Sequence, residues 1–435
     1  MTRGEGVRRG ARVVVVGAGF AGASLIRNLP PALRRSDETL LVDRSEEYPF
    51  IPLVHEVAVG RIHPDSVRSP IPPLCEGRCD FLKAEVIGVD LAEKALLTSA
   101  GRVGYELLVL AAGSDAVRPP GGLSPHFQLF WTLGDALRLR ASLRNAWRSA
   151  VGPPSAREPE QDGDLTVAIA GGGATGVELA AEVAVLFQYL EKRSTRSPAV
   201  EPRVVLLEAE ERLISWLPEF FHEVALEQLT RLGVEVRLNA PVEEASEEGL
   251  RAGDDWLPAR IRVWTAGIEI SNLVKELPGE HGPAGRIRVD RHLTLPGRAE
   301  IYVLGDAGFY EDPRHGPLPP TASVAVQQGP WTARDLSRRL RGRDAPAKRP
   351  PFRFFNRGYV VSLGPENAVA DALGVRLRGP AAQALYRGVL LYYLKSRRDR
   401  VLAASDWAME RTIGRVGFDL AAAVRSEARV PSDPR

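Results

Sequence analysis

Two glycine-rich stretches, about 150 residues apart, have glycines at the spacing that is typical of phosphate-binding turns. The first, GAGFAG, occupies residues 17–22, and the second, GGGATG, occupies residues 171–176. In the pattern G-x-G-x-x-G, the first glycine permits a tight turn, the second lets a pyrophosphate approach the backbone, and the third lets the following helix pack closely. The free N–H groups at the start of that helix attract phosphate charge. Each stretch therefore predicts a site for the pyrophosphate of a dinucleotide.

A carboxylate behind each turn could bind the ribose of the same dinucleotide. Asp43 lies 21 residues after Gly22, close to the spacing of about 20 residues that this type of site uses. Glu208 lies 32 residues after Gly176, because an insertion at 191–202 lengthens the connection. A carboxylate at this position repels a 2′-phosphate, which favours NADH over NADPH at the second turn. The alternative is an ordinary turn between a strand and a helix, with an acid nearby by chance.

Strands that alternate with helices must hold both turns in place. Continuous apolar runs predict buried strands, and apolar residues at helical spacing predict helices. The expected strands are 12–16, 39–45, 105–113, 165–170, 203–208, 260–267 and 299–308, and the expected helices are 23–29, 133–150, 174–190 and 219–232. This alternation is typical of parallel sheets covered by helices. The sequence therefore predicts an α/β fold with two Rossmann-like dinucleotide-binding domains.

Two dinucleotides held by one chain indicate a particular kind of chemistry. The economical reaction is hydride transfer from a nicotinamide to a flavin, in which the cofactors carry the chemistry and the protein supplies position and electrostatics. No metal is expected, because the seven histidines are scattered without the spacing of metal ligands.

Composition excludes several classes of protein. A chain of 435 residues with 44% hydrophobic content can bury the cores of two or three domains. The two cysteines, Cys75 and Cys79, are too few for a disulfide framework and indicate a reducing compartment. The first apolar run is too short and too rich in glycine for a secretory signal, and we expect no membrane-spanning helix, because no window of about 18 uncharged apolar residues occurs.

Positive charge is concentrated in the last quarter of the chain. Residues 331–435 hold 21 Lys and Arg against 10 Asp and Glu, although the net charge of the whole chain is only +2. One face of an expected helix carries apolar residues, and basic residues follow it: Leu385, Val389, Tyr392 and Tyr393, then Lys395, Arg397, Arg398 and Arg400. Such a pattern is typical of a helix that lies on an anionic membrane. The alternatives are a dimer contact, a helix that covers the core, or codon bias towards arginine. No nucleic-acid partner is expected, because no binding motif accompanies the charge.

Seven segments, spread over nearly the whole chain, carry a family resemblance. They are VVVVGAGFAG, LVDRSEEYPFIPLVHEVAVG (41–60), YELLVLAAGS, GGGATGVELA, RVWTAGI, IYVLGDAG and YYLKSRRDRVLAASDW (392–407). Together they resemble the type II NADH dehydrogenases, which are single-subunit NADH:quinone oxidoreductases that do not pump protons. The segment 41–60 and the C-terminal segment are specific to that family, whereas the others occur in many flavoproteins that bind two dinucleotides. The resemblance implies that NADH reduces FAD and that electrons pass on to ubiquinone or menaquinone.

The resemblance also implies which residues bind the cofactors. For FAD they are Gly17, Gly19, Phe20, Ala21, Gly22, Asp43, Arg44, Leu53, Val86, Ala112, Gly113, Asp306 and Ala322. For NADH they are Gly172, Gly173, Gly176, Glu208, Ala266 and Gly267. Asp306 belongs to the family's Gly-Asp motif, whose acid binds the ribityl part of FAD.

Glu178 and Gln327 are the catalytic residues that the resemblance implies. Glu178 is expected near the contact between flavin and nicotinamide, on the path of protons to the quinone, because quinone reduction consumes two protons. The alternative is a first-turn carboxylate that interacts favourably with the helix dipole. Gln327 matches the second glutamine of the quinone-site pattern Ala-Gln-x-Ala-x-Gln, whereas Ser323 replaces the first, and a shorter hydroxyl cannot make the same reach. A smaller departure is Ala174, where the family usually has proline.

The expected domain order is discontinuous. We expect an FAD domain of residues 1–120 and 298–345, a connecting helix and linker at 121–164, an NADH domain at 165–297, and a C-terminal membrane-contact region at 346–435. The protein is expected at the cytoplasmic side of the cell membrane as a peripheral protein, with a homodimer possible. Two other functions stay open, a soluble NADH-dependent reductase with a non-quinone acceptor and a non-catalytic flavoprotein that senses NADH. A disulfide reductase is not expected, because Cys75 and Cys79 do not lie in the first helix after the FAD turn.

Overall fold

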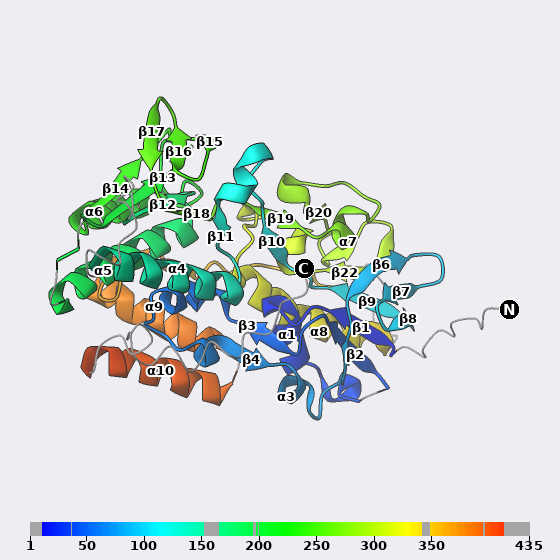
Figure 1. Ribbon diagram of the computed structural model, residues 1–435. Coiled ribbons are helices and arrows are strands. Elements are labelled where there is room, and N and C mark those ends of the chain that lie inside the picture. Colours follow the sequence, from blue (N-terminus) through cyan, green and yellow to red (C-terminus); the bar gives the residue numbers. More distant parts are fainter. Residues whose placement is uncertain are drawn as a thin grey trace. The chain divides into compact units, whose positions relative to one another are not determined.

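The protein was analysed as a computed structural model that describes residues 11–35, 37–151, 165–194, 197–198, 200–341, 349–394 and 396–412. The chain forms two compact units. The first unit comprises Met1–Tyr48, Pro70–Asp115 and Ile268–Asn356, and the second comprises Pro49–Ser69, Ala116–Gly267 and Arg357–Arg435. The expected linker at 152–164 lies outside the described residues. Each unit is described by itself below (Figure 1).

A six-stranded sheet forms the core of the first unit, in the order β21-β22-β9-β1-β2-β5. Its strands are β21 (Thr294–Leu295), β22 (Arg298–Val303), β9 (Leu107–Leu110), β1 (Val13–Val16), β2 (Thr39–Asp43) and β5 (Asp80–Lys83). All neighbours pair in parallel except β21 and β22. β1 lies between β2 and β9, so the chain leaves β1 where the strand order reverses, which is where open α/β sheets bind ligands.

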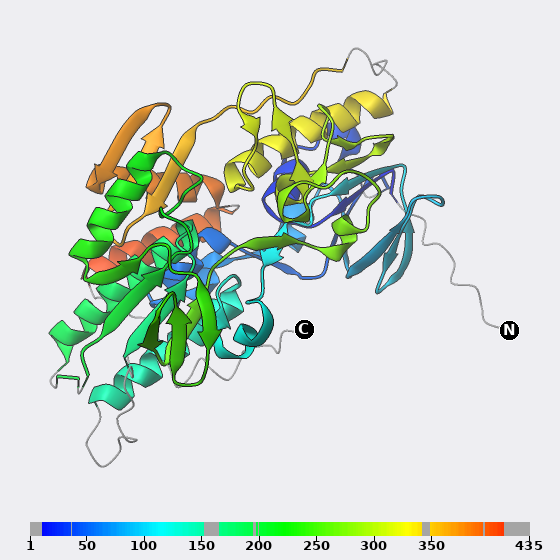
Figure 2. The same cartoon turned by 90° about the horizontal axis from the view of Figure 1, so that it is seen from above.

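Two helices pack together beside this sheet. They are α1 (Phe20–Arg27) and α8 (Ala322–Leu340), which Figure 2 shows alongside each other. Gly329 allows their close approach, because a Cβ at this position would lie 2.6 Å from the carbonyl oxygen of Ala21. The expected helix at 23–29 begins three residues earlier in the structure, at Phe20. Gly19, directly before it, is extended and forms its N-cap. A three-stranded antiparallel sheet of β6 (Val86–Asp90), β7 (Ala95–Thr98) and β8 (Gly101–Gly104) completes the larger elements.

The second unit repeats the same arrangement around a five-stranded parallel sheet, in the order β11-β18-β12-β13-β14. The strands are β11 (Gln128–Leu129), β18 (Ile261–Trp264), β12 (Thr166–Ala170), β13 (Arg203–Leu207) and β14 (Val234–Arg237). The helices are α4 (Leu133–Val151), α5 (Ala174–Arg193) and α6 (Glu219–Arg231), and a small antiparallel sheet contains β15 (Val242–Ala245), β16 (Gly249–Ala252) and β17 (Asp255–Pro258). β12 lies between β18 and β13, so the second glycine turn also begins where the strand order reverses.

The C-terminal part of the second unit contains an antiparallel sheet and two helices. The sheet contains β26 (Gly358–Ser362), β27 (Ala368–Ala372) and β28 (Val375–Gly379), and α9 (Pro380–Tyr393) packs against it. α10 (Arg397–Thr412) follows, and α2 (Val54–Ala58) packs against α4 and α5. In the part of the chain that the structure describes, no helix is both long and apolar enough to cross a membrane.

The remaining elements are short. The strands are β3 (Glu47–Pro49), β4 (Arg68–Pro70), β10 (Ser114–Ala116), β19 (Ile268–Ile270), β20 (Ile287–Arg288), β23 (Gly308–Phe309), β24 (Glu311–Asp312) and β25 (Gly316–Pro317). The short helices include α3 (Pro72–Cys75) and α7 (Asn272–Lys275).

Candidate functional site

The first glycine turn is shaped by close packing at its two ends. Gly17 has a φ of 94°, and a Cβ there would lie 2.4 Å from the carbonyl oxygen of Ala111. A Cβ at Gly22 would lie 1.9 Å from the carbonyl oxygen of Gly17. At Gly19 the nearest atom would be 3.9 Å away. Packing therefore demands the first and third glycines, whereas the second leaves room for a ligand to approach the backbone.

The second glycine turn has the same geometry. Gly171 has a φ of 111°, and a Cβ at Gly176 would lie 1.8 Å from the carbonyl oxygen of Gly171. A Cβ at Gly173 would meet no atom within 4 Å. The hydroxyl of Thr265 donates to the carbonyl oxygens of Ala170 (3.0 Å) and Gly171 (2.9 Å) and so fixes the start of the turn. Sequence reasoning did not select Thr265, although it stands in the motif RVWTAGI.

Both acids behind the turns contact the turns themselves. Asp43 Oδ2 accepts a hydrogen bond from the N–H of Ala18 at 2.7 Å. Glu208 Oε2 accepts one from the N–H of Gly172 at 2.6 Å. Each carboxylate therefore stands at the edge of its turn, where a ribose next to a bound pyrophosphate would lie. The open space at the second glycine and the adjacent carboxylate fit an ADP-containing dinucleotide in each unit.

The Gly-Asp motif of the first unit is held by side chains that sequence reasoning missed. Asp306 Oδ2 accepts a hydrogen bond from the hydroxyl of Ser114 at 2.7 Å, and burial raises the pKa of Asp306. The buried guanidinium of Arg286 donates to the carbonyl oxygen of Asp306 at 2.9 Å and also to those of Gly308 and Leu318. No local pattern marks Arg286, because its three acceptors come from other parts of the chain.

Two neighbouring glutamines of α8 have different surroundings. The buried Gln328 accepts a hydrogen bond from the N–H of Gly305 at 2.6 Å and so anchors the Gly-Asp motif. Gln327, the residue predicted from the sequence, exchanges two hydrogen bonds of 3.0 Å with the backbone of Phe355. Its amide also donates to the carbonyl oxygen of Ser323 at 3.1 Å. Phe355 is 60% exposed, so Gln327 holds the backbone of a residue whose aromatic ring is accessible.

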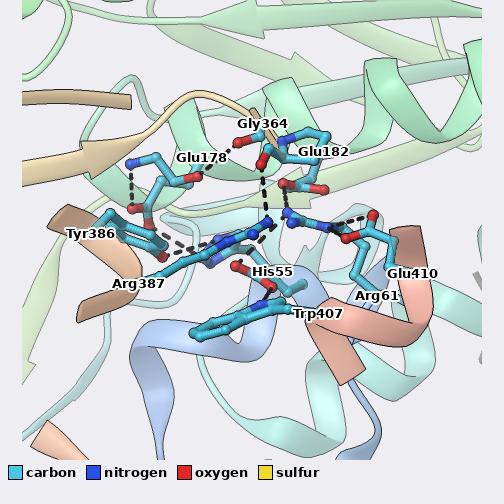
Figure 3. Close-up of polar contacts among 12 residues, drawn as sticks. His55, Arg61, Glu178, Glu182, Gly364, Tyr386, Arg387, Trp407 and Glu410 are labelled. Atoms are coloured by element: carbon cyan, nitrogen blue, oxygen red, sulfur yellow. Dashed lines mark hydrogen bonds and ion pairs between the residues drawn. The ribbon is translucent and has the colours of Figure 1, made fainter. Parts of the chain in front are cut away.

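Glu178 is a buried acid in the second turn of α5. Because α5 begins at Ala174, the alternative of a first-turn carboxylate is wrong. Its Oε1 accepts a hydrogen bond from the N–H of Ser362 at 3.1 Å, and its Oε2 lies 3.7 Å from His55 Nδ1 (Figure 3). Burial, together with the negative charges of Glu56 and Glu182, raises the pKa of Glu178 to about 8. Glu178 therefore carries a proton at neutral pH.

His55 and Tyr386 continue the line of polar groups from Glu178. His55 Nε2 lies 3.4 Å from the hydroxyl of Tyr386, which also lies 3.4 Å from the carbonyl oxygen of Pro52. Burial lowers the pKa of His55 to about 4 and raises that of Tyr386. A neutral imidazole thus lies between a protonated carboxyl and a neutral phenol (Figure 3).

A buried arginine balances the other carboxylates of this cluster. Arg61 pairs with Glu182, with Glu410 (2.9 Å) and with Glu56 (3.8 Å). These contacts raise the pKa of Arg61, although its burial acts in the opposite direction. The indole N–H of Trp407 donates to Glu56 Oε2 at 2.7 Å, so α10 supplies both Trp407 and Glu410 to the cluster. Sequence reasoning missed Arg61, because two of its three partners, Glu182 and Glu410, lie more than 100 residues away along the chain.

The remaining predicted residues divide between the two units. In the first unit, Arg44 is largely exposed, and its Nη2 lies 3.7 Å from Asp115 Oδ1. Val86 is the first residue of β6, and Ala322 is the first residue of α8. Ala112 and Gly113 follow β9. Phe20 and Ala21 begin α1, and the ring of Phe20 meets Tyr48 edge-on at a centroid distance of 5.7 Å. In the second unit, Leu53 is buried, and Ala266 and Gly267 follow β18.

The structure also describes both cysteines and the side chains that could bind a metal. Cys75 and Cys79 are free, and the N–H of Cys79 donates to the carbonyl oxygen of Cys75 at 3.0 Å. Among the described residues, no group of three or more His, Cys, Asp or Glu side chains is arranged to hold a metal ion.

Comparison with protein families identifies the class of enzyme. Residues 11–329 match the pyridine nucleotide-disulphide oxidoreductase family, and this span includes both glycine turns and the Gly-Asp motif. The chain belongs to this family. Membership confirms the α/β fold predicted from the sequence, and it confirms an oxidoreductase that uses FAD and a pyridine nucleotide.

Relatives with assigned names match the chain over most of its length. The type II NADH:quinone oxidoreductase Ndh of Mycobacterium tuberculosis is 29% identical over 420 residues, which cover 92% of this chain and 87% of the relative. The demethylphylloquinone reductase NdbB of Synechocystis is 27% identical over 417 residues, which cover 93% of this chain and 96% of the relative.

Solved structures show the same fold. NDH2 from Plasmodium falciparum, in complex with NADH, has a TM-score of 0.81 at 16% identity and covers 94% of this chain and 99% of its own. The sulfide:quinone oxidoreductase of Aquifex aeolicus has a TM-score of 0.70 at 17% identity, with 93% and 96% covered.

Proposed function

We propose that this chain is a type II NADH:quinone oxidoreductase, which oxidises NADH through FAD and delivers electrons to a membrane quinone without pumping protons. The observation that carries the proposal is the pair of glycine turns, each with open space at its second glycine and a carboxylate at its edge. Relatives named for this activity match the chain over about nine-tenths of its length, which supports the choice of electron donor and acceptor.

The two turns divide the cofactors between them. Gly17, Gly19 and Gly22 would hold the pyrophosphate of FAD, with Asp43 on the ribose. Gly172, Gly173 and Gly176 would hold that of NADH, with Glu208 on the ribose, where its charge disfavours a 2′-phosphate. Bound FAD supplies a two-electron acceptor that can pass its electrons on singly or in pairs. The protein itself binds both cofactors, orients them and supplies protons.

Glu178 is the proton-holding residue in this proposal. Quinone reduction consumes two protons, so a group that carries a proton at neutral pH is required near the acceptor. The pKa of Glu178, raised to about 8 by burial, means that Glu178 carries such a proton at neutral pH. His55 stays neutral and lies beside Oε2, where it orients the carboxyl. Glu178 is therefore assigned as the acid, and His55 as a residue that positions it.

We propose that Gln327 lies at the quinone site and that the ring of Phe355, which Gln327 holds, contributes to it. Ser323 lies one turn earlier on α8, and its carbonyl oxygen accepts from Gln327. A glutamine at position 323 would restore the first glutamine of the family pattern, and its amide would reach further than the serine hydroxyl.

We also propose peripheral binding to the anionic cytoplasmic face of the membrane. α9 and α10 expose Tyr392 (64%), Val401 (63%) and Met409 (41%), while Arg397, Arg398 and Arg400 are exposed nearby along the chain. Lys395 lies outside the described residues. The opposite face of α9 buries Tyr386 and Leu390, so this helix also covers the core, as one alternative expected. The assignment of 346–435 as a membrane-contact domain and the homodimer stay proposals.

Steady-state oxidation of NADH with a soluble ubiquinone analogue tests the proposed function in FAD-loaded protein. We expect quinone-dependent turnover, and Ser323→Gln is expected to raise it without changing turnover with ferricyanide, which needs no quinone site. A fully flavinated protein that reduces ferricyanide but shows no quinone-dependent turnover would refute the assignment of quinone as the electron acceptor.

The replacement of a family glutamine by Ser323 favours one second candidate, a soluble NADH-dependent reductase with another acceptor. Sedimentation with phosphatidylglycerol vesicles distinguishes the two functions, because the soluble reductase predicts no retention. A flavoprotein that only senses NADH predicts, instead, slow or absent flavin reduction on rapid mixing with NADH.

A further inference from the structure

A cavity of about 370 Å³ lies in the first unit among residues that neither cofactor assignment uses. Its lining includes Trp331, Arg334, Arg338, Pro350, Pro351 and Arg353. Its volume falls in the range of small-ligand pockets, which is about 300–1,000 Å³.

Two segments of the chain line this cavity. Trp331, Arg334 and Arg338 occupy positions i, i+3 and i+7 of α8 and therefore share one face of the helix. The extended segment that carries Arg353 returns alongside α8 (Figure 2). Phe352 fixes that segment, because its N–H donates to the carbonyl oxygen of Arg291 at 2.8 Å.

Two contacts hold parts of the lining in place. Arg349, just before the extended segment, pairs through Nε with Asp335 Oδ1 at 3.0 Å. Trp331 stacks against His292 at a centroid distance of 6.5 Å and an interplanar angle of 18°, which fixes the orientation of the indole. A ligand that enters the cavity therefore meets backbone and an indole ring that are already positioned, which lowers part of the entropic cost of binding.

The cavity is strongly positive. Arg334, Arg338 and Arg353 are exposed, and none of the three has an ion-pair or hydrogen-bond partner among the described residues. Among the described residues that line the cavity, the one acid is Asp335, which is buried and already accepts from the hydroxyl of Tyr302 at 2.6 Å and from Arg349. Three guanidinium groups around one cavity repel each other, and a bound anion removes that repulsion.

The residue types select among anions. A guanidinium presents a fork of N–H donors that matches a phosphate in two-pronged geometry. Trp331 and the two prolines offer an apolar wall beside the charges, which suits the carbon body of an organic ligand better than a bare ion. We propose that this cavity binds an organic phosphate, with its phosphate group held by Arg334, Arg338 and Arg353 and its carbon body against Trp331.

A free phosphorylated metabolite and the headgroup of an anionic phospholipid both present this chemistry. The experiment therefore has two arms, both with FAD-loaded protein saturated with NAD⁺, so that the two glycine turns are filled. The first arm titrates inorganic pyrophosphate by calorimetry at low ionic strength. The second arm measures co-sedimentation with vesicles of phosphatidylglycerol, against vesicles of phosphatidylcholine.

The variant Arg334→Gln/Arg338→Gln removes two of the guanidinium groups, and Arg353→Gln removes the third. Arg35→Gln/Arg314→Gln is the matched control, because it removes the same charge from exposed positions of the same unit outside the cavity. We expect the double cavity variant to lose at least about tenfold in affinity, since charge-assisted hydrogen bonds are lost with each arginine.

Loss of pyrophosphate binding in the cavity variants, with the control unchanged, supports a soluble ligand. Loss of vesicle binding in those variants alone, without a pyrophosphate isotherm for the native protein, supports a lipid headgroup. Equal behaviour of the cavity variants and the control in both arms overturns the proposal. Trp331→Leu gives a further readout, because it should weaken binding of glycerol 3-phosphate more than of inorganic phosphate.

Discussion

Glu178 makes the protein less stable as pH rises, and Glu178→Gln should remove that penalty. The side chain is largely buried, with 14% of it exposed; the carboxyl accepts one hydrogen bond from the N–H of Ser362 and lies near the negative charges of Glu56 and Glu182. A glutamine has nearly the same shape, and its oxygen can still accept from Ser362. The substitution therefore changes ionisation with little change in packing.

The magnitude follows from the shift in pKa. The folded-state pKa of Glu178, about 8, lies above the ordinary value of 4.5. The folded protein thus binds this proton more tightly than the unfolded chain does, and the resulting stability is present in full below pH 4.5 and is lost as pH rises towards 8. The full loss corresponds to about 5 kcal/mol, of which about 2 kcal/mol falls between pH 6.5 and pH 9. His55 has a pKa lowered to about 4 and stays neutral throughout that window.

Urea unfolding of FAD-saturated protein at pH 6.5, 8 and 9 measures this difference. We expect the free energy of unfolding of Glu178→Gln to exceed that of the native protein by an amount that grows by about 2 kcal/mol across the window. Glu191→Gln is the matched control, because Glu191 lies exposed on the same helix. It should leave the pH dependence unchanged.

Turnover gives an independent readout of the same group. If Glu178 donates its proton, the quinone-dependent kcat of the native protein falls above about pH 8. Glu178→Gln should have a low turnover at every pH, without this decrease above pH 8. Native and Glu178→Gln stability curves that run parallel from pH 6.5 to pH 9 would refute the reasoning, since they would mean that Glu178 is already ionised at pH 6.5.

Three further predictions concern other parts of the structure. Arg61→Met should lower the free energy of unfolding by about 3–5 kcal/mol, because it leaves buried carboxylates without a counter-charge, and Arg61→Lys should lower it less; chemical denaturation measures both. Gly173→Ala should keep the melting temperature but raise the KM for NADH about tenfold or more, because its Cβ enters the open space of the turn. Gly176→Ala should instead lower the melting temperature, because its Cβ would meet the carbonyl oxygen of Gly171 at 1.8 Å. Gln328→Leu removes the acceptor of the Gly305 N–H, at a cost of about 1–3 kcal/mol, and should speed the release of FAD on dilution, as followed by flavin fluorescence.

Each of these predictions has an outcome that contradicts it. Equal stability of Arg61→Met and Arg61→Lys would mean that charge is not what Arg61 supplies. A lowered melting temperature for Gly173→Ala would mean that the space at the second glycine is needed for folding. Unchanged flavin retention in Gln328→Leu would mean that the Gly-Asp motif is held without this contact.

The amino-acid sequence by itself determined the two glycine turns, the acids behind them and the positions of the main buried strands along the chain. These features are local, because a glycine is needed where a Cβ would meet backbone a few residues away, as at Gly22 and Gly176. Strands and helices are likewise visible as apolar runs and helical periodicity within a short window. The same local patterns placed Asp43 and Glu208 at the ends of their strands.

Only the tertiary structure decided the state of Glu178 and the roles of its neighbours. Its pKa depends on burial and on Glu56 and Ser362, which lie 122 and 184 residues away along the chain. Arg61 is balanced by partners from three different segments, and no spacing in the sequence records such a meeting. Desolvation and charge pairing act through space, so a residue that reads as an ordinary helix acid becomes, in the folded protein, one that keeps its proton at neutral pH.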